Sequence, residues 1–262
     1  MSVELLLAFL MGLLWGSFAN VVIYRLPAGQ SVVTPRSRCP QCSHPIAWYD
    51  NIPVLSWLFL LGRCRACKTG ISWRYPLVEL ITGVVFAAVF WNYGLTWSAL
   101  EYLIFAWGLI VVSFIDFDHM ILPDVFTLPG IALGLLGAAV NPERDFLSAA
   151  AGVLMGGGFL WLIAYFYLLL RKEEGMGGGD IKLLAWIGAV LGWTAVPFVV
   201  LASSLVGSVV GLVLAMRSRA GLKSQIPFGP YLALAALVYL LGGDRIGLWY
   251  VSLFLPTVNP VN

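Results

Sequence analysis

Apolar runs close to membrane-spanning length are the feature of this chain that most limits its fold. Eight runs can be read, at 5–24, 77–91, 99–115, 125–140, 149–170, 183–196, 198–216 and 230–241. A transmembrane helix needs about 20 predominantly apolar residues, and the chain is 60% hydrophobic but only 11% charged. The sequence therefore predicts an all-α polytopic membrane protein with about eight transmembrane helices.

The basic residues alternate between the breaks that separate these runs. Positive charge collects in the first, fifth and seventh breaks and just beyond, at Arg25, Arg36, Arg38, Arg63, Arg65, Lys68, Arg74, Arg171, Lys172, Lys182, Arg217, Arg219 and Lys223. The opposite side holds only Arg144 and Arg245. By the positive-inside rule, both termini lie outside and the basic breaks lie in the cytoplasm.

The two ends of the chain carry separate expectations. The first run has Glu4 where a signal peptide would have basic residues, so we expect a retained helix. The tail at 248–256 is rich in aromatic residues but too short to span, which indicates an anchor at the outer interface.

Carboxylates gather in two breaks that the charge pattern places on the same, cytoplasmic side. One break contains Asp116, Asp118 and Asp124, and the other contains Gly177, Gly179 and Asp180. Ionisable groups at membrane depth are costly and mark candidate functional sites. The glycines would allow close backbone approach, and Asp180 is placed to cap a helix. The alternative for Asp180 alone is a flexible loop with a helix cap.

Two carboxylates can hydrolyse a peptide if one accepts a proton from water and the other donates one to the carbonyl oxygen. Such a pair shares a proton, because two close negative charges are unfavourable. The helix dipole favours the charged form of Asp180 and the neutral form of Asp116. We therefore expect Asp180 to act more often as the base and Asp116 as the acid, with joint titration.

The four cysteines lie in the polar segment 26–75, as Cys39-x-x-Cys42 and Cys64-x-x-Cys67. Two such pairs place four thiolates around a tetrahedral ion, which predicts a structural zinc site. The alternative, two disulfides, does not suit a reducing cytoplasm. Four sulfur ligands close the shell, so we expect His44 to be a surface residue.

Several other polar or small residues have two interpretations. Glu79, near the start of the second run, is either an acid favoured by the helix dipole or a ligand for a basic group of substrate or cofactor. The small and polar residues that precede and include Asn20 indicate tight helix packing or a functional role. Gly156, Gly157 and Gly158 favour close helix contact rather than a dinucleotide site, because no strand precedes them.

The motifs Asp116-x-Asp118-x-x-x-Leu122-Pro123-Asp124 and Gly177-Gly178-Gly179-Asp180 resemble those of the type IV prepilin peptidase family. The first run through Asn20, the cysteine loop and the stretch around Glu79 are also similar to that family. The resemblance implies that Asp116 and Asp180 are catalytic and that Asn20 lines the site. It further implies cleavage of a basic prepilin or pseudopilin leader after a glycine, then N-methylation from S-adenosylmethionine, at the bacterial inner membrane.

These expectations define three regions: a first helix at 1–25, a cytoplasmic zinc-binding loop at 26–75, and a peptidase region at 76–262. Asp118 and Asp124 are expected to attract a basic substrate or to serve as loop and cap residues. The expected partners are prepilins and membrane lipid, with no nucleic acid. Two alternatives stay open, an intramembrane aspartyl protease with other substrates and a non-enzymatic proton-coupled membrane protein.

Overall fold

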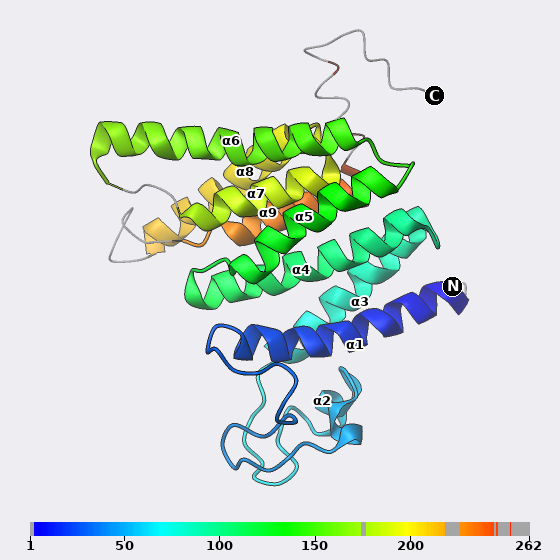
Figure 1. Ribbon diagram of the computed structural model, residues 1–262. Helices are drawn as coiled ribbons and strands as arrows, with labels where there is room; N and C mark the ends of the chain where they lie inside the picture. Colours follow the sequence, from blue (N-terminus) through cyan, green and yellow to red (C-terminus); the bar gives the residue numbers. More distant parts are fainter. Residues whose placement is uncertain (1–2, 174–176, 218–225, 244, 246–251, 253–262) are drawn as a thin grey trace. The chain divides into compact units, whose positions relative to one another are not determined.

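The computed structural model of the chain describes residues 3–173, 177–217, 226–243, 245 and 252 (Figure 1). The elements are α1 (Val3–Arg25), η1 (Trp48–Asn51), α2 (Leu55–Phe59), α3 (Arg74–Tyr93), α4 (Trp97–His119), α5 (Asp124–Val140), α6 (Phe146–Arg171), α7 (Gly178–Leu191), α8 (Ala195–Arg217), α9 (Gly229–Val238) and η3 (Tyr239–Gly243). Among these residues the named elements are all helices, and the only β-structure is two isolated bridges, Arg38–Pro45 and Arg63–Gly70. The all-α prediction is confirmed.

Five of the described helices, α1, α3, α4, α6 and α8, are long and apolar enough to cross a membrane. The other three predicted runs also largely coincide with helices, but α5, α7 and α9 have only 17, 14 and 10 residues. At about 1.5 Å per residue they are shorter than a hydrocarbon core of about 30 Å. A membrane protein is therefore confirmed, while the count of eight spans stays a prediction.

The sixth run was placed at 183–196, but the helix there has different ends. α7 begins earlier, at Gly178, and ends at Leu191. The helix stops because Gly192 follows with φ +81°, a conformation that favours glycine. The aromatic anchor predicted at 248–256 lies outside the described residues, apart from Ser252.

The chain divides into two compact units, Met1–Val111 and Val112–Asn262, with the boundary inside α4. In the first unit α1 packs along α3 through small residues. A Cβ added at Gly16 would lie 2.6 Å from the Glu79 Cα, and one at Gly12 would lie 2.7 Å from the Gly83 Cα. The two helices approach this closely only because glycines occupy the contact.

In the second unit α7 contacts α5, α6, α8 and α9, and its Leu183, Leu184 and Ile187 are fully buried (Figure 1). A Cβ at Gly156 on α6 would lie 2.5 Å from the carbonyl oxygen of Leu184, and one at Gly157 would lie 3.2 Å from the Ala185 Cβ. The predicted close helix contact is thus confirmed at these two glycines, whereas Gly158 faces open space.

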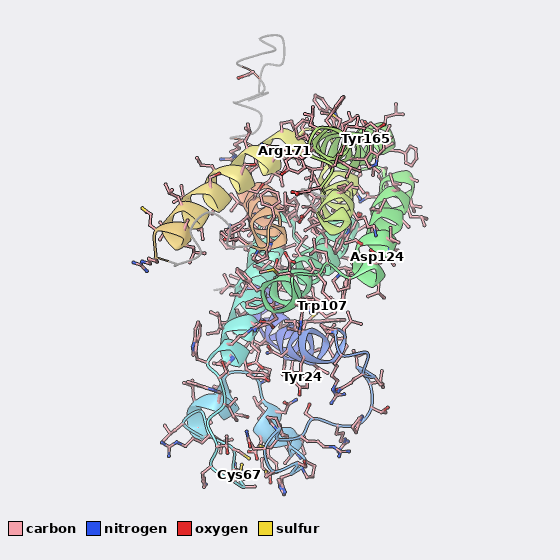
Figure 2. The ribbon with its side chains drawn as sticks, turned by 90° about the vertical axis from the view of Figure 1, so that its left-hand side faces the viewer. Tyr24, Cys67, Trp107, Asp124, Tyr165 and Arg171 are labelled. Atoms are coloured by element: carbon pink, nitrogen blue, oxygen red, sulfur yellow. The ribbon has the colours of Figure 1, made fainter. Side chains whose placement is uncertain are left out.

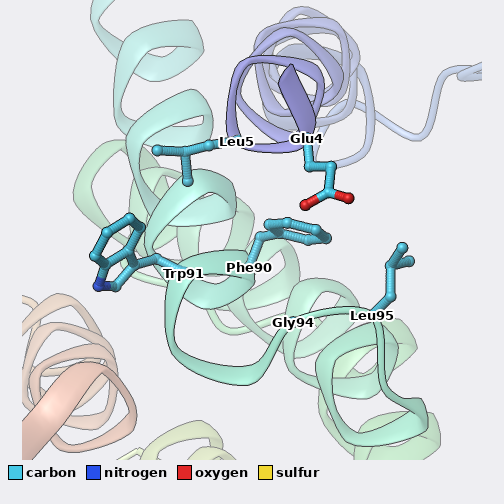
Figure 3. A pocket seen from close by; sticks show the side chains of 6 residues that line it. All are labelled: Glu4, Leu5, Phe90, Trp91, Gly94 and Leu95. Carbon is cyan, nitrogen blue, oxygen red and sulfur yellow. The ribbon is translucent and has the colours of Figure 1, made fainter. Parts of the chain in front are cut away.

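The first unit has a cavity of about 340 Å³ where α1 begins and α3 ends. Its lining residues are Glu4, Leu5, Phe90, Trp91, Gly94 and Leu95 (Figure 3). Figure 3 shows the Glu4 carboxylate beside the Phe90 ring. None of the residues that the sequence singles out for function lines this cavity.

Candidate active site and zinc site

Asp116 lies in the last turn of α4 and is only 5% exposed. Its Oδ2 accepts a hydrogen bond from the backbone N–H of Gly229, at 3.1 Å, where α9 begins. A Cβ added at Gly229 would lie 2.7 Å from that same oxygen, so a larger residue would collide with the carboxylate. The sequence analysis missed Gly229, although a glycine directly before Pro230 at a helix start is a readable signal.

Asp180 is the third residue of α7, and Gly177 occupies the N-cap position without a side-chain cap. The prediction that Asp180 caps the helix is therefore wrong, because the helix starts before it. Burial, together with the charge of Asp116, raises the pKa of Asp180 to about 7. The two carboxyls thus interact electrostatically, and the direction of the shift is opposite to the one that the helix dipole predicts.

Leu122 is the residue through which the segments of this site meet. A Cβ at Gly179 would lie 2.8 Å from the Leu122 Cβ, and one at Gly229 would lie 3.0 Å from the Leu122 Cδ2. The loop after α4, the start of α7 and the start of α9 therefore converge on one side chain. Close approach is confirmed at Gly179 but not at Gly177, whose added Cβ would meet nothing within 4 Å.

Asp124 does not cap α5, because it is the first residue of that helix and Pro123 holds the N-cap position without a side-chain bond. Its carboxylate instead accepts from the Lys182 Nζ, at 2.7 and 2.9 Å. Lys182 lies two positions beyond Asp180, so this ion pair ties the start of α5 to the first turns of α7. Asp118 is exposed near the end of α4. Figure 2 labels Asp124 where α5 begins.

Asn20 and Glu79 belong to the first unit, where both make contacts that the sequence analysis missed. The Asn20 Nδ2 donates to the backbone carbonyl of Tyr75 at 3.0 Å. Glu79 is 8% exposed, and its Oε2 accepts from the backbone N–H of Val54 at 2.7 Å. Val54 has φ +61°, which is strained for a β-branched residue. Glu79 therefore holds a strained loop residue against α3, while a role for Asn20 or Glu79 toward substrate stays a prediction.

The four cysteine sulfur atoms lie within 4.8 Å of one another, which confirms the predicted cluster. The Sγ atoms of Cys39 and Cys67 are 3.7 Å apart. Around a tetrahedral zinc with bonds of about 2.3 Å, two sulfurs lie about 3.8 Å apart, so the cluster fits the ion. His44 is exposed, as expected for a residue outside the ligand set. Figure 2 labels Cys67 in this loop.

The two halves of the cluster have the same backbone geometry. The N–H of Ser43 donates to the Cys39 carbonyl at 2.9 Å, and the N–H of Lys68 donates to the Cys64 carbonyl at 3.0 Å. Ser43 and Lys68 have similar positive φ values, +56° and +61°. Each Cys-x-x-Cys therefore closes in an equivalent turn that aims both thiols inward.

The side chain of Thr69 favours the ligand form of one thiol. Its Oγ1 lies 3.3 Å from the Cys67 Sγ. Hydrogen bonding by Thr69 and interactions with the neighbouring thiols lower the pKa of Cys67 to about 6. A thiolate is the form that binds zinc. Desolvation and hydrogen bonds with the other thiols raise the pKa of Cys42 to about 11, so Cys67 ionises before Cys42.

The fold and site define a polytopic membrane protein with an interacting aspartate pair and a four-cysteine loop. Residues 10–93 match the bacterial peptidase A24 N-terminal domain, and residues 103–212 match the type IV leader peptidase family. The chain belongs to the type IV leader peptidase family. No solved structure matches it.

Curated relatives match this chain over nearly its whole length. It is 44% identical over 277 residues to the "Prepilin leader peptidase/N-methyltransferase" of Aeromonas hydrophila, covering 95% of this chain and 94% of the relative. Proteins of the same name from Stutzerimonas stutzeri and Pseudomonas aeruginosa are 42% and 41% identical, each covering 94% of this chain and 93% of the relative.

Proposed function

We propose that this protein is a prepilin leader peptidase that also N-methylates the new amino terminus. It removes the basic leader of prepilins or pseudopilins after a glycine and then transfers a methyl group from S-adenosylmethionine. Family membership and relatives of that name over nearly the whole chain support the proposal. The observation that carries the peptidase chemistry is the electrostatic interaction of the buried Asp116 with the partly buried Asp180.

Near neutral pH the pair holds one shared proton. That proton resides mainly on Asp180, whose pKa is raised to about 7 by burial and by the charge of Asp116. Asp116 is the partner that accepts the Gly229 N–H through its Oδ2, so we assign it the role of proton acceptor. These roles reverse the assignment that the helix dipole alone favours. The dipole at the start of α7 would lower the pKa of Asp180, but burial and the nearby charge of Asp116 raise it by more.

In the reaction, Asp116 removes a proton from water as the water oxygen attacks the scissile carbonyl carbon. Asp180 gives its proton to the carbonyl oxygen, which yields a neutral tetrahedral diol. The diol then collapses: Asp180 takes back a hydroxyl proton, Asp116 protonates the leaving nitrogen, and the carbon–nitrogen bond breaks. The pair ends the cycle with one proton, as it began.

Cys39, Cys42, Cys64 and Cys67 would hold a structural zinc ion. Four thiolate ligands leave no open position for water, so the metal supports the loop and takes no part in hydrolysis. A segment of this size buries little apolar surface by itself, and metal binding supplies folding free energy. S-adenosylmethionine would supply the methyl group, and the residues that bind it are not assigned.

The proposed location is the bacterial inner membrane, with eight helices embedded in the lipid. The five long helices cross it, and the shorter α5, α7 and α9, with the residues that flank them, make the other three of the eight crossings that the positive-inside pattern requires. The positive-inside pattern puts both termini outside and Asp116 and Asp180 at the cytoplasmic face. Substrate leaders therefore meet the site from the cytoplasm.

Co-expression with a prepilin, followed by mass measurement of its amino terminus, tests the proposal. We expect a product that lacks the leader and carries one methyl group. Cleavage of other membrane proteins but not of prepilins would favour an intramembrane protease with different substrates. Proton transport without any cleaved product would favour a non-enzymatic protein.

A further inference from the structure

The short helix α2 presents its apolar face outward. Leu55, Leu58 and Phe59 are 51%, 54% and 84% exposed. Their spacing of three and four residues places them on one face of the helix. The buried residue of α2 is a serine, Ser56. This distribution is the reverse of that in a helix of a soluble domain, whose apolar face packs inward.

The other face of α2 is fastened to the loop by polar groups. The Ser56 Oγ donates to the Tyr49 carbonyl at 2.8 Å and accepts from the Ile52 N–H at 3.1 Å. The Trp57 Nε1 donates to the Ile71 carbonyl at 3.0 Å. These three bonds fix the rotation of α2 about its axis, so its apolar face cannot turn inward.

A hydrogen bond holds α2 beside a helix that is long and apolar enough to span the membrane. Val54 directly precedes α2, and its N–H donates to the Glu79 Oε2 at 2.7 Å. Glu79 follows Arg74, the first residue of α3, by five positions, or about 7.5 Å along the helix axis. The start of α2 is therefore level with the second turn of α3 and not with its end.

Exposed aromatic side chains mark the level of the membrane surface on the same unit. Tyr24 lies in the last turn of α1, Trp73 directly precedes α3 and Tyr75 lies in its first turn, and all three are exposed. Tyr and Trp at the ends of membrane helices lie at the level of the lipid headgroups. Glu79 lies further into α3 than these residues, so α2 is attached at the depth of the interface.

The loop that carries α2 is basic. Its only acidic residue between positions 26 and 75 is Asp50, which pairs with Arg65 at 2.7 Å. The other basic residues of this segment are Arg36, Arg38, Arg63, Lys68 and Arg74. Anionic lipids attract basic segments next to a membrane helix, and α1 and α3 hold both ends of this loop at the membrane. An anionic bilayer surface therefore complements both the charge of the loop and the apolar face of α2.

We propose that α2 is an interfacial helix that docks the cysteine-containing loop on the membrane surface. Leu55, Leu58 and Phe59 insert among the lipid chains, while the basic residues of the loop contact anionic headgroups. Figure 2 shows Cys67 at the end of the loop remote from Tyr24, so the cysteine cluster lies away from the lipid. The inference requires that α1 and α3 cross the bilayer, and it does not depend on peptidase activity.

Photo-cross-linking of the full chain in lipid vesicles tests this docking. Benzoylphenylalanine replaces Leu58 or Phe59 in the test variants and Ala66, an exposed residue next to Cys67, in the control. The vesicles contain phosphatidylcholine with or without phosphatidylglycerol, and the mass of the irradiated protein reveals attached lipid. We expect about tenfold more attached lipid at positions 58 and 59 than at 66. Phosphatidylglycerol should raise the yield at 58 and 59, and added salt should reduce that increase.

Equal lipid attachment at the test and control positions would overturn the inference. Attachment of positions 58 and 59 to protein in place of lipid would also overturn it, because a second copy or a substrate would then cover this face. Zinc content, measured for each variant, confirms that the loop is folded.

The bond between Val54 and Glu79 provides a second test. Glu79→Ala removes the acceptor and should reduce lipid attachment at position 59 several-fold, whereas Glu79→Gln keeps an acceptor oxygen and should retain it. Unchanged attachment in Glu79→Ala would overturn the assignment of this bond as the group that holds α2 at the interface. No turnover is measured, so these outcomes are independent of whether a prepilin is cleaved.

Discussion

Both units of this protein bury acidic side chains near the ends of membrane helices, but they use them differently. In the first unit the Glu79 Oε2 accepts the Val54 N–H at 2.7 Å and so fastens a loop to α3. In the second unit Asp116 has a similar donor in Gly229, but it also faces the acidic group of Asp180. Burial of a carboxylate is thus common to both units, while the unfavourable pairing of two occurs in the second.

This difference separates a structural acid from a reactive one. The carboxylate of Glu79 accepts a hydrogen bond from a loop N–H and so holds that loop in place. Two carboxylates that disfavour each other's ionisation must share a proton, which keeps that proton available for transfer. The expected effects of mutation should therefore differ sharply between Glu79 and the Asp116–Asp180 pair.

The largest effect is expected from Asp116→Asn and Asp180→Asn. Each amide keeps the shape of the side chain but can neither hold nor pass the shared proton, so leader cleavage should fall by about 10³-fold or more. Cleavage in membranes with matched protein levels is the measurement. Glu79→Gln is the control from the other unit, and its leader cleavage should fall only a few-fold. Near-normal turnover of either Asn variant would remove that residue from the pair.

The next effect concerns the loop that Glu79 holds. Cys39→Ser or Cys67→Ser should abolish zinc binding, since each removes one of four thiolate ligands. Cleavage should fall about tenfold through loosening of the loop, far less than for the aspartate variants. Metal analysis of purified protein measures the first change, and His44→Ala should retain full zinc. Fully active wild-type protein without zinc would contradict the assignment.

The pH dependence of leader cleavage should show whether Asp116 and Asp180 share a proton. The pKa of Asp180 is raised from 3.8 to about 7, so above pH 7 the pair loses its shared proton. Cleavage should then decrease about tenfold per pH unit on the alkaline side, besides an acid limb where a second proton binds. A rate profile with an acid limb alone would contradict a shared proton.

The same shift has a consequence for stability with a definite sign. Between pH 4 and 7 the folded protein binds the Asp180 proton more tightly than the unfolded chain does. Asp180 therefore contributes its full stability below about pH 4, and this contribution is lost as pH rises through 7. Thermal melts should show that Asp180→Asn gains stability relative to the wild type as the pH is raised across this window.

The smallest effect is expected at the ion pair of Asp124 and Lys182. Both side chains are partly exposed, 56% and 38%, so the pair adds little to stability. It does connect the start of α5 to α7, and Asp124→Lys or Lys182→Asp alone should reduce kcat a few-fold. The double exchange should restore part of that loss. If Asp124 served only to attract the basic substrate, the double exchange would instead raise KM. Added salt would then reduce the difference in KM between the variant and the wild type.

The sequence predicted the helical fold and the cysteine cluster well, because both depend on local pattern. Apolar runs specify helices, and two Cys-x-x-Cys pairs specify a tetrahedral site wherever the chain brings them together. The failures at Asp124 and Asp180 have another cause. Capping was inferred from the residue next to a presumed boundary, but α5 and α7 begin at or before these aspartates, so other residues take the cap.

Contacts between distant segments could not be read at all. Gly229 is 113 positions from Asp116, and Val54 is 25 positions from Glu79. In both contacts the donor is a backbone N–H, which every residue except proline possesses. The sequence of side chains therefore cannot predict either hydrogen bond. The role of Leu122 could not be predicted either, because a leucine in apolar sequence carries no signal of function. Its role follows only from the close approach of Gly179 and Gly229 to its side chain.

The bond from Gly229 to Asp116 also limits what genetics can reveal about this enzyme. Substituting alanine at each position in turn deletes side chains, yet the group that holds Asp116 belongs to the main chain and survives nearly every such exchange. A defect at Gly229 would reflect the bulk of the added Cβ, 2.7 Å from the carboxylate oxygen, and not the missing donor. Chemical synthesis that replaces this one amide by an ester would delete the donor while leaving every side chain in place.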